Sequence, residues 1–178
     1  DHPLYYDLPF EEVEFNSRRG DVMLKGWYIH AAKVGPTLIF VHGINSIRSG
    51  DGAVEIAYRL WLRGFSTLLF DLRAHGSSGG DRVSAGQYEI EDVLGAFDYL
   101  IERDVDHDRI GLIGFSLGAG VAIMAASREP SIRAVVADSP FATVSELLSQ
   151  ETARKMPLSA DASSIFLPAA KIMAKHLY

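Results

Sequence analysis

The chain has 178 residues, of which 48% are hydrophobic and 22% charged, as expected for one globular domain. It has no cysteine, which excludes disulfides, zinc–thiolate sites and a cysteine nucleophile. The net charge is −6 and no basic cluster stands out, so we expect no nucleic-acid partner.

No apolar run approaches the ~18–20 residues that span a bilayer. A cytoplasmic location is favoured. Because the chain begins with Asp1 rather than Met, a preceding signal or membrane anchor stays open.

Short apolar runs alternate with amphipathic segments along the chain. The runs predict strands over residues 13–15, 24–30, 37–41, 66–70, 110–114 and 132–137. The last four runs lack polar alternation, which is typical of strands buried on both faces of a parallel sheet. Helices are predicted over residues 53–63, 90–101 and 117–128. Gly64 is placed to cap the first helix, and Ser84 and Gln87 have capping-box spacing before the second.

This alternation requires crossover connections, so we expect an α/β fold with a mostly parallel central sheet flanked by helices. In such sheets the functional groups lie at the carboxyl ends of the strands. The loops of interest therefore begin at His42, Asp71, Ser116 and Asp138.

The segment Gly114–Gly118 reads G-x-S-x-G and joins a predicted strand directly to a predicted helix. This context is typical of a nucleophile elbow, in which a strained turn exposes the hydroxyl of the serine, here Ser116. Side chains at the two glycine positions would collide at such a turn. The backbone N–H of Leu117, at the start of the helix, is placed to stabilise an oxyanion. The alternative interpretation is a glycine-rich strand–helix turn with an incidental serine, or a phosphate loop, although the lysine of a P-loop and a G-x-G-x-x-G pattern are both missing.

A second motif, His42-Gly43-Ile44, follows the predicted strand over residues 37–41. An oxyanion hole needs a second N–H donor, and a loop at this place can supply it. We expect the N–H of Ile44 to be that donor, because Gly43 lets the backbone approach closely. His42 itself is interpreted as a packed, hydrogen-bonded loop residue in preference to a catalytic base.

Together these segments resemble the α/β-hydrolase superfamily, in particular its small serine-hydrolase branch of esterase- and aminopeptidase-like enzymes. The resemblance covers residues 13–141 and rests on four ordered segments: 40–43 (FVHG), 71–77 (DLRAHGS), 108–118 (DRIGLIGFSLG) and 138–141 (DSPF). It implies that Ser116 is the nucleophile and that Leu117 and Ile44 form the oxyanion hole. It also implies a small-molecule acyl substrate and no metal or organic cofactor.

The segment 71–77 resembles the family's D-x-R-G-H-G-x-S loop, with Ala74 where glycine is usual. Asp71, Arg73 and His75 are interpreted as residues that organise this loop. The alternative for His75 is the base of a catalytic triad. The family takes its base from a position further along the chain, which favours the loop role.

A serine nucleophile needs a histidine base and an orienting acid, which follow the serine in this family. Only His176 follows Ser116, and it is interpreted as a solvated helical histidine. Asp138 is an alternative acid at a strand end, although a structural role is favoured; Asp161 is interpreted as a surface or capping residue. We therefore expect the acid and the base to lie beyond Tyr178.

These observations predict a single α/β-hydrolase domain that is C-terminally incomplete and lacks its last two strands. Residues 1–141 are expected to form the core, and residues 142–178 the start of a helical lid-type insertion. The strand at 132–137 should then either form an open sheet edge or be covered by a neighbouring chain, which gives a route to self-association. The predicted activity is serine hydrolysis of esters, thioesters or amides through an acyl-enzyme, with this chain alone inactive. The alternatives are a non-catalytic binding domain and an acyltransferase.

Overall fold

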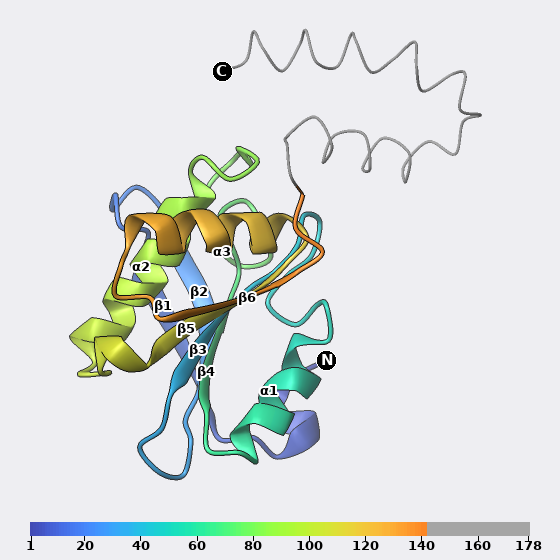
Figure 1. The fold of residues 1–178 in the computed structure, drawn as a ribbon. Coiled ribbons are helices and arrows are strands. Elements are labelled where there is room, and N and C mark those ends of the chain that lie inside the picture. Colours follow the sequence, from blue (N-terminus) through green and yellow to red (C-terminus); the bar gives the residue numbers. More distant parts are fainter. Residues whose placement is uncertain (142–178) are drawn as a thin grey trace, which may run out of the picture. The chain divides into compact units, whose positions relative to one another are not determined.

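A computed structural model describes residues 1–141, which contain a six-stranded sheet of order β1-β2-β4-β3-β5-β6 (Figure 1). β1 and β2 pair antiparallel with each other, and β2 also pairs antiparallel with β4, whereas the pairs from β4 to β6 are parallel. The strands are β1 (Phe10–Asn16), β2 (Met23–Ile29), β3 (Thr37–Val41), β4 (Ser66–Phe70), β5 (Ile110–Phe115) and β6 (Ala134–Asp138). The helices are η1 (Pro3–Tyr6), α1 (Ala53–Trp61), α2 (Glu89–Glu102), η2 (His107–Arg109) and α3 (Leu117–Arg128).

The helices cover both faces of the sheet: α1 lies on one side, and α2 and α3 lie on the other (Figure 1). The central strands are buried because their apolar runs meet helices on both faces, and every residue of β4 is buried. Residues of α1 pack with the sheet residues Trp27, Phe40 and Leu69 in one hydrophobic core. The predicted α/β fold with a mostly parallel sheet is therefore confirmed.

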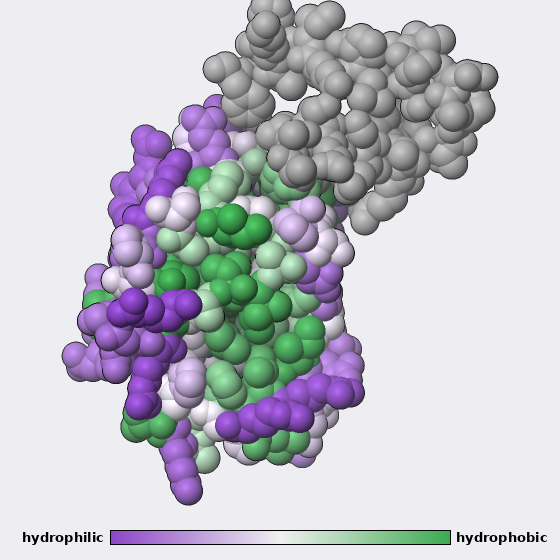
Figure 2. All heavy atoms as spheres, viewed as in Figure 1, coloured by the Kyte–Doolittle hydropathy of each residue, from purple (hydrophilic) through white to green (hydrophobic). Residues whose placement is uncertain are grey.

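The strand at 132–137 was expected to be buried, and this was wrong. The residues of β6 alternate between exposed and half-buried, and Val136 is 58% exposed. Within residues 1–141, β6 pairs on one side only, with β5, and so forms the sheet edge, which agrees with the open edge predicted at this strand. In the view of Figure 2, apolar side chains gather across the face on which Figure 1 draws β6 and α1.

The predicted capping box before α2 paired Ser84 with Gln87, and this was also wrong: the partner of Ser84 is Glu89. Ser84 donates hydrogen bonds from its N–H and its Oγ–H to the carboxylate of Glu89, each at 2.7 Å. Gly86, with a φ of 111°, turns the chain so that its own N–H donates to the same carboxylate at 2.7 Å. The helix therefore starts at Glu89, and Gln87 lies in the preceding turn.

The predicted lid segment, with Asp161 and His176, lies outside the described residues. Asp1–Pro140 form one compact unit. None of the helices within residues 1–141 has the length and apolar character needed to cross a membrane.

Candidate active site

Ser116 stands between β5 and α3 in a strained backbone conformation, with φ 51° and ψ −114°. The two flanking glycines explain how the chain tolerates this turn. A Cβ on Gly114 would lie 2.4 Å from the carbonyl oxygen of Gly118. A Cβ on Gly118 would lie 2.1 Å from the carbonyl oxygen of Val41, at the end of β3. A side chain at either glycine position would therefore collide with the backbone, as predicted.

Ser116 lines an open pocket of about 380 Å³, together with Asp51, Ile56, Phe115, Asp138 and Ser139. Its N–H donates to the carbonyl oxygen of Asp138 at 2.9 Å, which ties the turn to the end of β6. Its own carbonyl oxygen accepts the N–H of Ala119 at 3.1 Å, in the first turn of α3. Within residues 1–141, no side chain forms a hydrogen bond with Ser116 Oγ.

The N–H groups of Leu117 and Ile44 are both unengaged by other groups of residues 1–141. Leu117 is the first residue of α3, and the first N–H groups of a helix have no partner inside it. The β3–α1 loop that carries Ile44 also touches the serine, since a Cβ on Gly43 would lie 3.4 Å from Ser116 Cβ. The structure thus brings both predicted donor segments to the Ser116 turn.

His42 is buried, and both of its ring nitrogens are engaged. Nε2 accepts the N–H of Leu72 at 3.0 Å, so Nδ1 carries the proton and donates to the carbonyl oxygen of Gly43 at 2.8 Å. Burial lowers the pKa of His42, which favours this neutral form. The interpretation of His42 as a packed, hydrogen-bonded loop residue is confirmed.

Asp71 organises the loop after β4, as predicted. Its buried carboxylate accepts the N–H of Arg48 at 2.7 Å and the N–H of Ser77 at 2.9 Å. The carboxylate fits closely against the loop, because a Cβ on Gly76 would lie 2.2 Å from Asp71 Oδ2. Asp71 therefore joins the β3–α1 loop to the β4–α2 loop.

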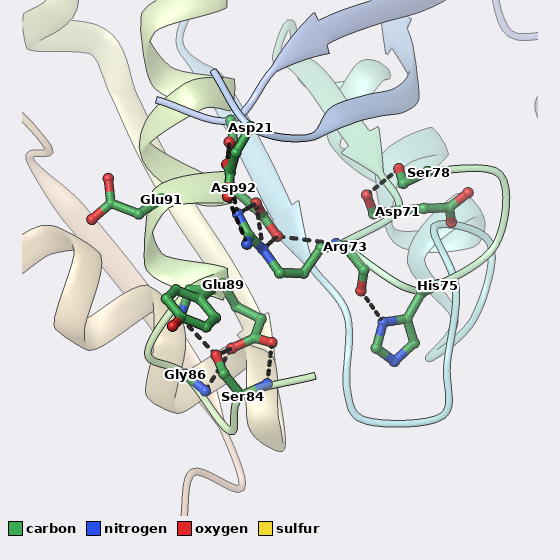
Figure 3. Close-up of polar contacts among 12 residues, drawn as sticks. Asp21, Asp71, Arg73, His75, Ser78, Ser84, Gly86, Glu89, Glu91 and Asp92 are labelled. Atoms are coloured by element: carbon green, nitrogen blue, oxygen red, sulfur yellow. Dashed lines mark hydrogen bonds and ion pairs between the residues drawn. The ribbon is translucent and has the colours of Figure 1, made fainter. Parts of the chain in front are cut away.

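Arg73 anchors the same loop to α2 (Figure 3). Its guanidinium Nη2 lies 2.7 Å from Asp92 Oδ1. Its backbone N–H donates to Asp92 Oδ2 at 3.0 Å. A weaker pair at 3.4 Å joins Arg73 to Asp21. Burial raises the pKa of Asp92 to about 6 despite the guanidinium. His75 Nδ1 lies 2.8 Å from the carbonyl oxygen of Arg73, in agreement with the loop role predicted for both residues.

Sequence reasoning did not find Asp51, whose Oδ2 accepts the N–H of Gly43 at 3.0 Å. The sequence signal is weak, since Asp51 only precedes a helix start. Asp138 lies in the Ser116 pocket as expected, and its Oδ1 accepts a hydrogen bond from Ser139 Oγ at 2.8 Å. Whether Asp138 acts as a triad acid stays a prediction.

Within residues 1–141, one group of side chains has spacing suited to a metal ion: Asp106, His107 and Asp108. All three are exposed, and Asp108 is already paired with Arg133. The group precedes β5, whereas Ser116 follows it, so the two lie at opposite ends of this strand.

Residues 36–171 match the model of the alpha/beta hydrolase fold family. The chain belongs to this family. The resemblance predicted from the sequence is therefore confirmed at the level of the family and its fold.

Among curated proteins, this hydrolase-fold chain is similar to an acyltransferase, drtE of Aspergillus calidoustus. The two are 33% identical over 137 residues, which cover 75% of this chain and 44% of that protein. It is also 32% identical over 128 residues to the lysophosphatidylserine lipase ABHD12 of Gallus gallus, covering 70% of this chain and 32% of the lipase. Among solved structures, the esterase Pf2001 of Pyrococcus furiosus superposes with a TM-score of 0.81 at 31% identity, over 94% of this chain and 66% of the esterase. The chain spans about half the length of the curated relatives it matches.

Proposed function

We propose that the protein is a serine hydrolase acting on ester, thioester or amide bonds, with Ser116 as its nucleophile. The observation that carries the proposal is the Ser116 turn, where the strained serine lies beside two N–H donors that no group of residues 1–141 engages. The names of the relatives support it, because esterases, lipases and acyltransferases all transfer an acyl group from or to an oxygen, nitrogen or sulfur atom.

In this mechanism Ser116 Oγ forms a bond to the acyl carbon while its proton passes to a base. The carbonyl oxygen becomes an oxyanion and accepts hydrogen bonds from the N–H groups of Leu117 and Ile44. Collapse of the tetrahedral intermediate breaks the bond to the alcohol, thiol or amine, which leaves with the proton from the base. Water then releases the acid from the acyl-enzyme.

The base of the triad is proposed to come from outside residues 1–141, and so is the acid, with Asp138 as the alternative acid. Both ring nitrogens of His42 are engaged, which argues against it as the base. His75 is engaged only at Nδ1, but within residues 1–141 no hydrogen bond joins it to Ser116 Oγ. His176 lies outside the described residues, so its role is open to a direct test. The resemblance favours an acid and a base beyond Tyr178.

The substrate is proposed to be a small acyl compound. Ile56 and Phe115 give the pocket an apolar wall, while Asp51 and Asp138 place two carboxylates beside Ser116. This mixture suits a neutral acyl group better than an anionic one, because an anion would be repelled by the carboxylates.

Two other functions share the same residues. An acyltransferase is supported by the similarity to drtE, and it differs only in that an acceptor other than water reaches the acyl-enzyme. A non-catalytic binding domain is favoured if no base reaches Ser116. Product analysis with and without an added alcohol acceptor separates hydrolysis from acyl transfer.

The proposal is tested by hydrolysis of p-nitrophenyl esters by the full-length protein. Ser116→Ala should lower kcat by about 10⁶-fold, a loss typical when a serine nucleophile is removed. Ser127→Ala is the matched control and should keep the wild-type rate, since Ser127 Oγ only donates to the carbonyl oxygen of Met124 at the far end of α3. His176→Gln examines the one histidine that follows Ser116 in this chain. Turnover that survives in Ser116→Ala would refute the proposal.

A further inference from the structure

We infer that Asp51 is a positioning residue for the proposed oxyanion hole. Its carboxylate holds the Gly43 backbone so that the next N–H, that of Ile44, stays free beside Ser116. The inference rests on the proposed function, because Ile44 acts as an oxyanion donor only if Ser116 is a nucleophile.

Both backbone polar groups of Gly43 are held. Its N–H donates to Asp51 Oδ2 at 3.0 Å, while its C=O accepts from His42 Nδ1 at 2.8 Å and from the N–H of Ser46 at 3.2 Å. A trans peptide is planar, so the fixed C=O of Gly43 also fixes the N–H of Ile44, which points in the opposite direction. Asp51 therefore holds the peptide before Gly43, while His42 and Ser46 hold the peptide that carries the N–H of Ile44, so the two adjacent peptides are fixed together.

This arrangement lies in contact with the nucleophile. A Cβ placed on Gly43 would be 3.4 Å from Ser116 Cβ and 3.7 Å from Asp51 Oδ2. Asp51 also lines the same pocket as Ser116. A shift of the Gly43 peptide would therefore move the Ile44 donor relative to the position of the oxyanion.

The local backbone directs the Asp51 side chain to Gly43 and away from its own helix. Asp51 has a φ of 55°, in the left-handed region that Asp and Asn tolerate better than most residues. The N-cap of α1 is Gly52, and it provides no side-chain cap. A carboxylate next to a helix start commonly caps that helix, yet the bond formed by Asp51 reaches back eight positions along the chain. Its role is therefore in the β3–α1 loop.

The first test measures amide hydrogen exchange at Gly43 by NMR in the 178-residue chain. Asp51→Gly removes the acceptor and still tolerates a positive φ, whereas Asp51→Asn keeps an acceptor oxygen. We expect exchange at Gly43 to be about tenfold faster in Asp51→Gly and unchanged in Asp51→Asn. Asp104→Gly is the matched control, since Asp104 is also exposed and has a φ of 60°, but it lies just after α2. Unchanged exchange in Asp51→Gly would overturn the inference.

The second test measures the rate at which a fluorophosphonate labels Ser116 in the full-length protein. Asp51→Gly should slow labelling by about 10- to 100-fold, somewhat less than the loss of a whole oxyanion donor. Asp51→Asn and Asp104→Gly should label at nearly the wild-type rate, because both keep an acceptor for Gly43. Equal slowing in Asp51→Asn and Asp51→Gly would overturn the inference, since charge and not position would then matter.

The two tests separate failure of the inference from failure of the proposed function. If wild-type Ser116 is not labelled, the proposed function is wrong, and the exchange rate at Gly43 still decides whether Asp51 holds the loop. If Ser116 is labelled and Asp51→Gly labels at the wild-type rate, the proposed function stands and the role of Asp51 is rejected.

Discussion

Ser116 and Ala74 both adopt positive φ, at 51° and 57°, although neither is a glycine. Such conformations cost on the order of 1–3 kcal/mol and persist where the surroundings impose them. At Ser116 the glycines at 114 and 118 permit the close approach that the turn needs, and the bonds of the Ser116 backbone to Asp138 and Ala119 hold it in place. At Ala74, the backbone N–H donates to the carbonyl oxygen of Gly79 at 2.8 Å. The neighbouring residues Arg73 and His75 hold the loop in this conformation through their own hydrogen bonds.

His42 gives a prediction about pH. Burial lowers its pKa below the ordinary value of 6.5, so the unfolded chain binds the proton first as the pH falls. The stability that depends on neutral His42 is therefore present above pH 6.5 and declines below it, by at most about 1.4 kcal/mol per pH unit. The free energy of unfolding in urea, measured from about pH 8 to about pH 5, should fall more steeply in the wild type than in His42→Gln. Parallel pH profiles would contradict this account.

At the scale of elements, two buried ion and hydrogen-bond clusters connect the β4–α2 loop to α2 (Figure 3). One joins Arg73 to Asp92, and the other joins Glu89 to the segment that starts at Ser84. Both carboxylates come from the first turn of α2, which therefore fixes the two ends of the loop. Through Asp71, this loop in turn supports the β3–α1 loop that carries Gly43.

Loss of Asp92 should be costly, because Arg73 would stay buried without its main partner. We expect Asp92→Ala to lower the free energy of unfolding by about 3–5 kcal/mol. Asp98→Ala, also on α2, is the matched control: its pair with Arg18 is partly exposed and should contribute about 1 kcal/mol or less. Urea unfolding at about pH 7.5, above the pKa of Asp92, measures both variants. Equal losses would show that burial of the Arg73 pair does not matter.

At the scale of the whole molecule, the sheet ends at β6 within the described residues, and its exposed face is apolar (Figures 1 and 2). An uncovered edge strand with β-branched side chains is a template for pairing with another strand. We therefore propose, as the sequence led us to expect, that the 178-residue chain associates with a second copy through this edge.

Val136 is the residue to change, since it is 58% exposed on β6. Val136→Lys should reduce self-association of the 178-residue chain, measured as the mass in solution over a range of protein concentrations. Val34→Lys is the matched control, because Val34 is 95% exposed in the loop between β2 and β3. A chain that is monomeric at all concentrations, or that responds equally to both changes, would count against association through β6.

The central strands and the Ser116 turn were predictable because their signals are local. Apolar runs mark β3, β4 and β5, and the spacing of two glycines around a serine describes the turn within five residues of sequence. The apolar run of β6 alone predicts a buried strand, and only the resemblance to a longer fold indicated that β6 would have one neighbour. Asp51 and Asp92 were missed for a related reason: their partners lie eight and nineteen positions away, and only the fold brings them together.

The central claim is that Ser116 is an activated nucleophile. The most direct test treats the full-length protein with a fluorophosphonate and locates the adduct by peptide mass spectrometry. The account predicts a single adduct on Ser116, absent from Ser116→Ala and retained in Ser127→Ala. An unmodified Ser116 in folded full-length protein, or an adduct on another serine that persists in Ser116→Ala, would contradict it.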